Sequence, residues 1–300
     1  MPPNSGRPAA TAVSVIEEPA PAKLNLYLHV TGRRPDGYHL LDSLFAFADI
    51  GDRIRLRPGE GPSLSVDGPF ASAAPAGPDN LALKALLALA EAVGRPPGVA
   101  MELTKALPVA AGIGGGSADA AAVLRGLCRL WDIDRRDPRI RTVAGSLGAD
   151  VPACLLGAAC FAAGIGDELT PAPSTAGLPV VLVNPGVALA TPDVFRARTG
   201  GFSAAARFDD RFDNPSDPRG WAAALRARRN DLTPAALALA PEIGEVLAIL
   251  EDPEGCLLAR MSGSGATCFG LFEDHAAARA AAEAIAARRP GWWVRPARLL

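Results

Sequence analysis

The sequence predicts an α+β protein whose 300 residues form two domains. Helical and strand patterns are mixed along the chain without the regular strand–helix alternation that is typical of a parallel sheet. Residues 24–30 alternate apolar and polar side chains, and this period of two indicates a half-buried strand. A third observation is the glycine-rich segment PVAAGIGGGSADAA at 108–121, which leads into an alanine-rich helical pattern.

Three parts are expected along the chain. Residues 1–18 are rich in Pro, Ala, Ser and Thr and are predicted to be a disordered tail, without the basic start and apolar run of a signal peptide. An N-terminal domain is predicted over 19–164 and a C-terminal domain over 165–300. Within the first, residues 58–78 are predicted to be a linker because Pro, Gly, Ser and Ala dominate them.

The remaining elements follow from periodicity and from start and stop signals. A helix over 80–93 is predicted because Asp79 or Asn80 can cap it and Gly94 and Pro96 end it. After the glycine-rich segment, apolar residues three and four apart predict a helix that Ser117 caps. Further helices are predicted at 138–147, 193–198, 220–229, 241–250 and 275–289, and further strands at 53–57, 101–104, 155–163, 180–183 and 268–272.

Charge and cysteine content exclude several classes of protein. A net charge of −2 offers no electrostatic case for binding nucleic acid or an anionic membrane. The apolar stretch at 151–165 is too short, and too broken by Pro and Gly, to span a bilayer. Five scattered cysteines without CxxC spacing predict reduced, buried thiols in a cytoplasmic protein, and no zinc site.

The glycine-rich segment carries most of the functional argument. Four glycines, Gly112 and 114–116, precede Ser117, so several backbone N–H groups can approach one ligand at the electropositive start of a helix. We interpret the segment as a phosphate cradle. It is neither a Walker A motif, since no lysine follows, nor a good dinucleotide fingerprint, since serine stands where a third glycine is needed. The alternative is a turn that only lets the helix pack closely on a strand.

Five segments together resemble the GHMP superfamily of small-molecule kinases. PAKLN at 21–25, RRPDGYH at 33–39, the glycine-rich loop, GADVP at 148–152 and SGSGAT at 262–267 occur in the order expected of that superfamily. The resemblance covers about 21–272 and implies a two-domain fold with the active site in the cleft between the domains, together with ATP and Mg²⁺. PAKLN and RRPDGYH are more specific than the glycine-rich loop, which indicates only the superfamily. They imply a small-molecule substrate, a cytidine diphosphate alcohol of isoprenoid precursor biosynthesis.

The resemblance implies that Asp150 is the base beside the substrate hydroxyl and that Lys23 is its cationic partner. A nearby ammonium keeps a carboxylate ionised and can stabilise charge on the transferred phosphoryl group. Taken singly, Asp150 is better explained as a cap before Val151 and Pro152, and Lys23 as a solvent-facing residue at a strand edge. Taken together with the glycine-rich loop, the two residues favour the catalytic interpretation.

Substrate and nucleotide contacts are also implied by the resemblance. Tyr38 and Phe195 are expected to hold the cytosine ring between them, and His39 to form a hydrogen bond with it. An ordinary packing role is almost as good an explanation for Phe195. Further substrate contacts are Asn25 and Thr191. The expected ATP-binding residues are Pro108, Val109, Ala110, Ala111, Gly112, Ile113, Gly114, Gly115, Gly116, Ser117 and Ala118, with Asn80 and Lys105 near the adenine.

The metal ligand predicted in this sequence is Ser117. Many members of the superfamily have a second serine after this one, but Ala118 stands here, so a single hydroxyl is available for magnesium or phosphate. Asp119 could also reach the metal, although acidic residues are common in the first turn of any helix. Two other functions remain open: a GHMP kinase that acts on a different alcohol, and a non-catalytic nucleotide-binding protein of the same fold.

Overall fold

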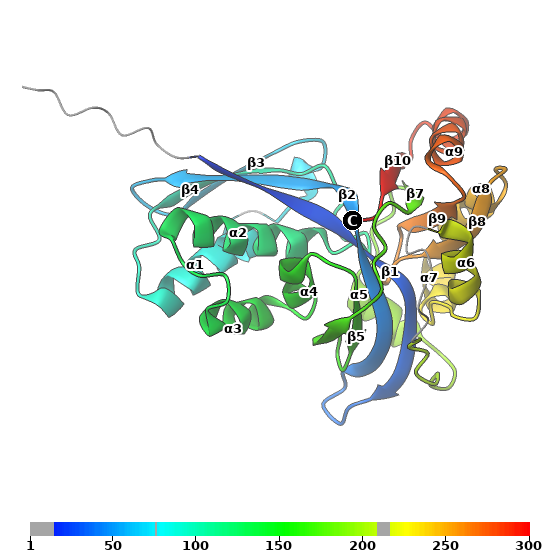
Figure 1. Ribbon diagram of the computed structural model, residues 1–300, viewed down its shortest axis with the longest axis horizontal. Coiled ribbons are helices and arrows are strands. Elements are labelled where there is room, and N and C mark those ends of the chain that lie inside the picture. The colour runs from blue at the N-terminus through cyan, green and yellow to red at the C-terminus, as the bar shows by residue number, and fades with distance from the viewer. Residues whose placement is uncertain (1–14, 76, 209–216) are drawn as a thin grey trace, which may run out of the picture.

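The computed structural model of the chain describes residues 15–75, 77–208 and 217–300. Two long antiparallel strands, β1 (Ile16–Arg33) and β2 (His39–Pro58), connect its two parts. In Figure 1 these strands run from the helices of the N-terminal part toward the sheet of the C-terminal part. The turn between them contains Gly37 at φ 96°, a left-handed conformation that suits glycine. The strand predicted at 24–30 is therefore the middle of a much longer one.

The N-terminal part is a sheet with helices packed against it. The strand order is β3-β4-β2-β5-β6, and β1 pairs with β2. The other strands are β3 (Ser63–Asp67), β4 (Val99–Thr104), β5 (Cys160–Ala163) and β6 (Glu168–Pro171). The helices are α1 (Leu81–Val93), α2 (Gly115–Trp131), α3 (Pro138–Leu147) and α4 (Val151–Leu156), with the short 3₁₀ helices η1 (Ala71–Ala73) and η2 (Gly77–Asp79) before α1. Leu86 of α1 and Leu124 of α2 share one buried cluster with Ile54 of β2.

The C-terminal part is a second sheet, in the order β10-β7-β9-β8. Its strands are β7 (Pro179–Asn184), β8 (Cys256–Met261), β9 (Cys268–Phe272) and β10 (Trp293–Arg298). Its helices are α5 (Thr191–Ala197), α6 (Pro218–Arg226), α7 (Thr233–Leu239), α8 (Glu242–Glu251) and α9 (His275–Arg288). All six residues of β7 are buried, because β10 and β9 flank it and its two faces pack into apolar clusters, Val181 and Val183 in one and Val180 and Leu182 in another.

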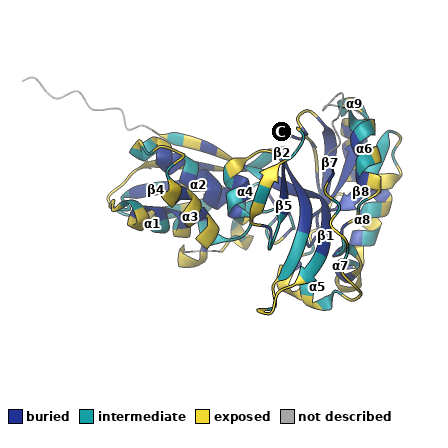
Figure 2. Ribbon diagram, turned by 60° about the horizontal axis from the view of Figure 1, so that its bottom comes forward, coloured by how far each residue is buried: buried dark blue, intermediate teal, exposed yellow. Residues whose placement is uncertain are grey.

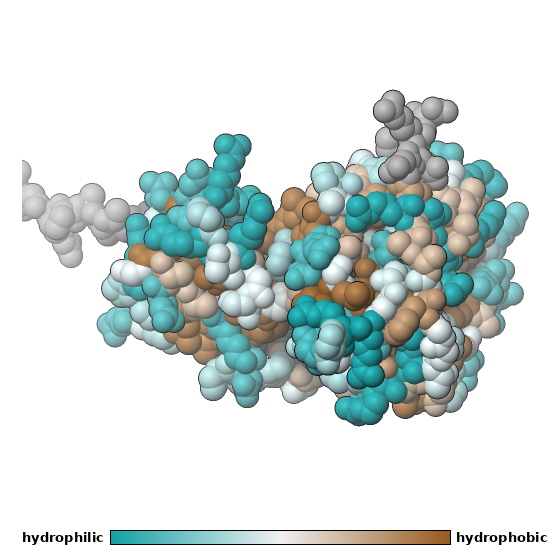
Figure 3. All heavy atoms as spheres, turned by 90° about the horizontal axis from the view of Figure 1, so that it is seen from below, coloured by the Kyte–Doolittle hydropathy of each residue, from teal (hydrophilic) through white to brown (hydrophobic). Residues whose placement is uncertain are grey.

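Strand β1 joins the two parts through backbone contacts and buried packing. Leu28 of β1 forms a parallel bridge with Asn230, and the buried guanidinium of Arg260 donates to the Leu26 carbonyl at 2.7 Å. Tyr27 of β1 lies in one apolar cluster with Phe269 of β9. Figure 2 shows the dark blue, buried stretch of β1 beside the C-terminal sheet. In Figure 3 apolar atoms are visible on the lower face between the two parts, with hydrophilic atoms around them. Side chains of β1 are thereby held at the junction.

The predicted α+β, two-domain class is confirmed, and several elements agree closely with their predictions. The helix at 138–147 and the strand at 268–272 have the predicted bounds. Asn80 caps α1, since its Oδ1 accepts from the Ala82 N–H at 2.9 Å, and Gly94 ends the helix at φ 69°. Among the residues described, no helix is both long enough and apolar enough to cross a bilayer. All five cysteines are free, and four are buried as predicted, but Cys256 is only partly buried.

Two predicted elements were wrong. The predicted linker at 58–78 contains β3, whose Leu64 and Val66 pack on the core while alternate residues are exposed, and which pairs in parallel with β4. The strand predicted at 155–163 begins at Cys160. The residues before it form α4, because Pro152 suits a first helical turn and Gly157 ends the helix at φ 65°.

Strands cross two of the predicted boundaries, the end of the tail at residue 18 and the end of the N-terminal domain at residue 164. Residues 1–14 of the predicted tail lie outside the described residues, but 16–18 already belong to β1. They are held there partly by charge, since Glu17 pairs with Arg55 at 2.8 Å and Glu18 with Arg129 at 2.6 Å. The first sheet continues past residue 164, because β6 pairs with β5 as far as Pro171.

Candidate active site

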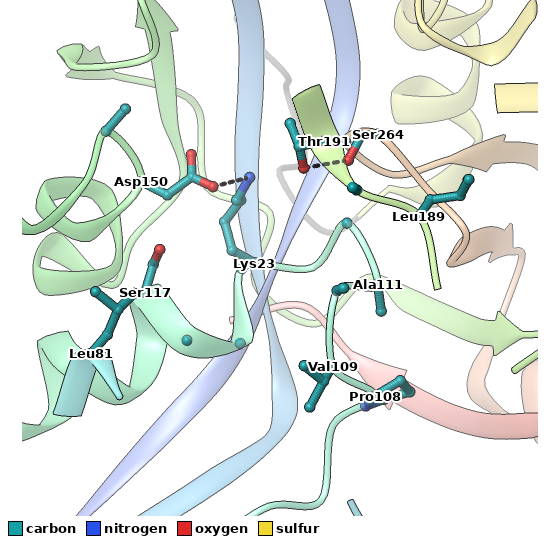
Figure 4. Close-up of a pocket in the computed structure, with 18 of the residues that line it drawn as sticks. Lys23, Leu81, Pro108, Val109, Ala111, Ser117, Asp150, Leu189, Thr191 and Ser264 are labelled. Atoms are coloured by element: carbon teal, nitrogen blue, oxygen red, sulfur yellow. Dashed lines mark hydrogen bonds and ion pairs between the residues drawn. The ribbon is translucent and has the colours of Figure 1, made fainter. Parts of the chain in front are cut away.

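A cavity of about 550 Å³ lies beside residues 108–117, and we name it the loop cavity. Both parts of the molecule line it, with Lys23, Ser117 and Asp150 on one side and Thr191 and Ser264 on the other (Figure 4). Most of the residues predicted to bind ATP line this cavity, namely Asn80, Lys105, Pro108, Val109, Ala110, Ala111, Gly112, Gly114, Gly115, Gly116 and Ser117. Ile113 and Ala118 do not line it, because both side chains are buried in apolar clusters.

The backbone of the loop explains two of its glycines in detail. Gly112 has φ 73°, and a Cβ there would lie 2.5 Å from the Ser262 carbonyl oxygen. Gly114 has φ 64° and is itself the N-cap of α2. The prediction that Ser117 caps this helix is therefore wrong, since the helix has begun at Gly115 and Ser117 lies in its first turn. The start of α2 and its unpaired N–H groups still face the cavity, as phosphate binding requires.

Lys23 and Asp150 form an ion pair of 3.0 Å in the wall of the loop cavity. Lys23 is 4% exposed, so it is not a solvent-facing strand residue. Its Nζ also donates to Asn25 Oδ1 at 3.0 Å, and its backbone N–H donates to the Ile113 carbonyl at 2.9 Å. Asp150 stands before α4, but its side chain makes no capping hydrogen bond. The carboxylate is 35% exposed and is therefore accessible from the cavity.

The turn at 262–265 connects β1 to the glycine-rich loop. The Ser262 hydroxyl accepts from the Asn25 backbone N–H at 3.0 Å and donates to the Gly112 carbonyl at 3.0 Å. The Asn25 amide donates to Ser43 Oγ at 2.8 Å, which fixes its orientation. Thr191 and Ser264 are joined through their hydroxyl groups at 2.8 Å (Figure 4). Asn25 and Thr191, both predicted substrate contacts, thus lie in the cavity wall with their side chains held in place.

Lys105 belongs to a buried group of charges that lies beneath the loop. Its Nζ contacts Asp52 and lies 2.8 Å from Asp119 Oδ2. Asp52 also accepts from the backbone N–H groups of Ala106 and Leu107 at 2.6 and 2.8 Å. Burial lowers the pKa of Lys105, but its attraction to the two carboxylates outweighs this and leaves the pKa raised. Burial raises the pKa of Asp119 to about 7. The ammonium therefore offsets the charge of Asp52 and binds Asp119, and Asp52 in turn holds the segment that leads into the loop.

We expect Lys105→Met to lower the free energy of unfolding by about 3–5 kcal/mol, because it leaves the buried Asp52 carboxylate without a cation and removes the partner of Asp119. Asp119→Asn should cost much less, since Lys105 then still faces Asp52. The control is Lys84→Met, which removes an exposed ion pair with Asp79 and should change stability by at most about 1 kcal/mol. Urea denaturation of the three variants checks this order. Equal effects of Lys105→Met and Lys84→Met would contradict the role given to Lys105.

A second cavity, which we name the turn cavity, has a volume of about 650 Å³ and lies beside the turn at 33–39. His39 and Phe195 line it and stack on each other, with ring centroids 5.0 Å apart. Tyr38 also lines the turn cavity, although its side chain is 61% exposed. The three rings that were predicted to bind the substrate therefore surround one cavity. Burial, followed by the charges of Arg33 and Arg198, lowers the pKa of His39. Its imidazole is therefore neutral at pH 7 and can either donate or accept a hydrogen bond.

Leu41, Ile165, Thr191 and Phe195 line both the loop cavity and the turn cavity. One ligand can therefore extend from the ion pair to the aromatic rings. Asp52 and Ser262 support this site, but neither is predicted individually from the sequence. No local pattern marks Asp52, which stands at an ordinary strand position, whereas Ser262 begins the serine–glycine segment SGSGAT at 262–267. Among the described residues, no group of three or more His, Cys, Asp or Glu side chains could hold a metal ion.

The glycine-rich loop, the ion pair and the two sheets together define the class of protein. The family profile "GHMP kinases N terminal domain" matches residues 80–158, and "GHMP kinases C terminal" matches 213–290. A homoserine kinase from Cytophaga hutchinsonii has the same fold, with a TM-score of 0.72 at 19% identity over 97% of this chain and 96% of its own.

Proteins with higher sequence identity to this chain show which family of GHMP kinases it belongs to. A 4-diphosphocytidyl-2-C-methyl-D-erythritol kinase from Paramagnetospirillum magneticum is 57% identical over 94% of this chain and 97% of its own length. One of the same name from Cereibacter sphaeroides is 54% identical over 94% and 98%. A crystal structure of 4-(cytidine 5'-diphospho)-2C-methyl-D-erythritol kinase matches with a TM-score of 0.76 at 37% identity, over 95% and 99% of the two chains. The chain belongs to the GHMP kinases and, within them, to the family of these 4-diphosphocytidyl-2-C-methyl-D-erythritol kinases.

Proposed function

We propose that this chain transfers the γ-phosphoryl group of ATP to the 2-hydroxyl of 4-diphosphocytidyl-2-C-methyl-D-erythritol. The observation that carries the proposal is the ion pair of Lys23 and Asp150, 3.0 Å apart in a cavity that the glycine-rich loop also lines. A protein that only bound nucleotides would not need a base beside the phosphate site. The acceptor alcohol is inferred from the names of the relatives that are more than half identical to this chain.

Phosphoryl transfer depends mainly on positioning and on stabilising charge. In the proposed reaction, the N–H groups of the loop and of the first turn of α2 hold the phosphates. Asp150 accepts the proton of the attacking hydroxyl at its carboxylate, and Lys23 stabilises the charge that develops on the transferred group. Lys23 is suited to this role because Asn25 and the carbonyl of Ile113 fix its position.

Magnesium is the proposed cofactor with ATP, and it would neutralise charge on the phosphate oxygens. Protein sites often hold this ion by one or two oxygen ligands together with substrate phosphates and water. The Ser117 hydroxyl lines the loop cavity and would supply such a ligand. Asp119 is a poorer candidate, because its Oδ2 is bound to Lys105 and its side chain is buried. The site residues fit a metal that arrives with ATP, and they do not form a preformed cage.

The proposed position of the substrate follows from the connection of the two cavities. The cytosine would lie in the turn cavity beside Tyr38, His39 and Phe195, and the alcohol would reach Asp150 past Thr191. A cytoplasmic location is part of the same proposal, and the free cysteines support it because disulfides are rare there.

We expect Phe195→Ala to raise the KM for the alcohol about 10-fold or more with little change in the KM for ATP, because base stacking on an aromatic ring contributes about 1–3 kcal/mol. The control is Phe202→Ala, which removes an exposed phenylalanine that lines neither cavity. Steady-state kinetics with each substrate varied in turn measures both constants. A raised KM for ATP alone would mean that the aromatic cavity belongs to the nucleotide.

Another alcohol acceptor is the main alternative to the proposed substrate. The experiment that separates them measures ADP release with a panel of alcohols, including mevalonate, homoserine, galactose and the proposed cytidine diphosphate alcohol. The proposal predicts efficient turnover with the last of these alone. Efficient turnover of any other alcohol would overturn the substrate assignment, whereas ATP binding without turnover of any acceptor would favour a nucleotide-binding protein.

A further inference from the structure

A third cavity borders the start of the glycine-rich loop, where Pro108 and Val109 line both it and the loop cavity. Its volume is about 390 Å³, which is within the usual range of pockets that bind small molecules. The start of the loop forms one wall, and the end of β7 and the segment around β10 form others. Because two of its lining residues are Trp292 and Trp293, we name it the tryptophan cavity.

The side chains of this cavity favour a flat ligand. Phe70, Trp292 and Trp293 offer aromatic surface for stacking. These aromatic walls therefore favour a ligand that is itself a flat ring.

The charge of the cavity favours an anion. Arg295 is the charged residue among those that line it, and no carboxylate lines it in the described part of the chain. The guanidinium of Arg295 donates to the Val294 carbonyl at 2.8 Å and lies 5.8 Å from the Trp293 ring, but it forms no ion pair with a described residue. Its remaining N–H groups are therefore available to a carboxylate or phosphate.

We propose that the tryptophan cavity binds a small planar aromatic anion and that this ligand weakens the binding of ATP. Two connections link the cavity to the loop. Pro108 and Val109 line both the tryptophan cavity and the loop cavity, so a ligand that pushes against them moves the wall of the nucleotide site. Asn184 lines the tryptophan cavity and donates to Thr267 Oγ1 at 2.9 Å, and the Thr267 N–H donates to the Ala111 carbonyl at 3.1 Å.

The binding half of this proposal is independent of the proposed function, and its test uses 1-naphthoate as the probe. Calorimetric titration of the full chain without ATP should give a submillimolar Kd. The neutral isostere 1-naphthalenemethanol should bind about 5- to 10-fold more weakly, since it lacks the charge that Arg295 attracts. Arg295→Gln should abolish this preference, and Ala188→Phe, which places a ring in the cavity, should abolish binding. Arg298→Gln, on the same strand but outside the cavity, should change nothing.

The absence of binding at millimolar naphthoate, or equal binding by wild type and Arg295→Gln, would overturn the proposed site. The regulatory half rests on the proposed role of the loop in ATP binding. Saturating naphthoate should weaken ATP binding about 5-fold, and saturating ATP should weaken naphthoate binding by the same factor, because such coupling is reciprocal. An unchanged Kd for ATP would overturn this half. A chain that did not bind ATP at all would contradict the proposed function, while the naphthoate titration would still decide the site.

Discussion

Asp150→Asn should lower kcat by about 10²–10⁴-fold while substrate binding persists, because the amide keeps the shape of the carboxylate but cannot accept a proton. The structure makes this substitution informative. The Asp150 side chain caps no helix and faces Lys23 at 3.0 Å, so the fold does not depend on it through capping. Steady-state kinetics and the unfolding transition measure the two effects separately.

The control for this variant is Asp137→Asn, at the residue that caps α3. Asp137 accepts from the Arg139 N–H at 3.0 Å, and its pKa is lowered to about 2, mainly by the hydrogen bond from the Arg139 side chain. This substitution should affect stability and leave kcat unchanged. A folded Asp150→Asn variant with nearly normal kcat would mean that Asp150 is not the general base.

Gly114→Ala should lower kcat about 10- to 100-fold, because small displacements of catalytic groups cost large factors in rate. A Cβ at Gly114 would lie 3.2 Å from both Cβ and Cε of Lys23 and 4.0 Å from Asp150 Oδ2. Lys23 is held on its other sides by Asn25 and Phe45, so it can yield only by leaving its position beside Asp150.

The matched control for Gly114→Ala is Gly94→Ala. Both glycines end or begin a helix in the left-handed region, at φ 64° and 69°, but a Cβ at Gly94 would meet nothing within 4 Å. Both variants should lose about 1–2 kcal/mol of stability from backbone strain, and only Gly114→Ala should lose activity. Equal kcat values for the two variants would show that the contact with Lys23 does not matter for the reaction.

Local signals predicted the elements whose structure is decided locally. Asn80 and Gly94 specify the ends of α1 through a cap and a left-handed glycine. The period of two at 24–30 identified a strand but not its length, because the ends of β1 are held by pairing with β2 across the whole hairpin. The strands β8 and β10 were not predicted. They depend on the C-terminal sheet and its core, which the sequence does not reveal.

The candidate site was likewise predicted only in part from the sequence. The motifs predicted that Lys23, Asp150 and the glycine-rich loop lie together, although 127 positions separate the lysine from the aspartate in the 300-residue chain. That prediction came from resemblance, since spacing along the chain cannot bring two distant residues together. Asp52 and Ser262 act on the loop through hydrogen bonds to its backbone and to the segment before it. Such contacts leave no mark in local sequence patterns.

The most direct test of the central claim, that Lys23 and Asp150 together perform the chemical step, is a double-mutant cycle measured by rapid-quench single turnover. Lys23→Ala, Asp150→Asn and the double variant would be compared with the wild type at saturating ATP and alcohol. If the two residues act as a unit, each single variant slows phosphoryl transfer strongly and the double variant is faster than the product of the two losses implies. Losses that multiply fully, or a single variant that transfers the phosphoryl group at the wild-type rate, would contradict the claim.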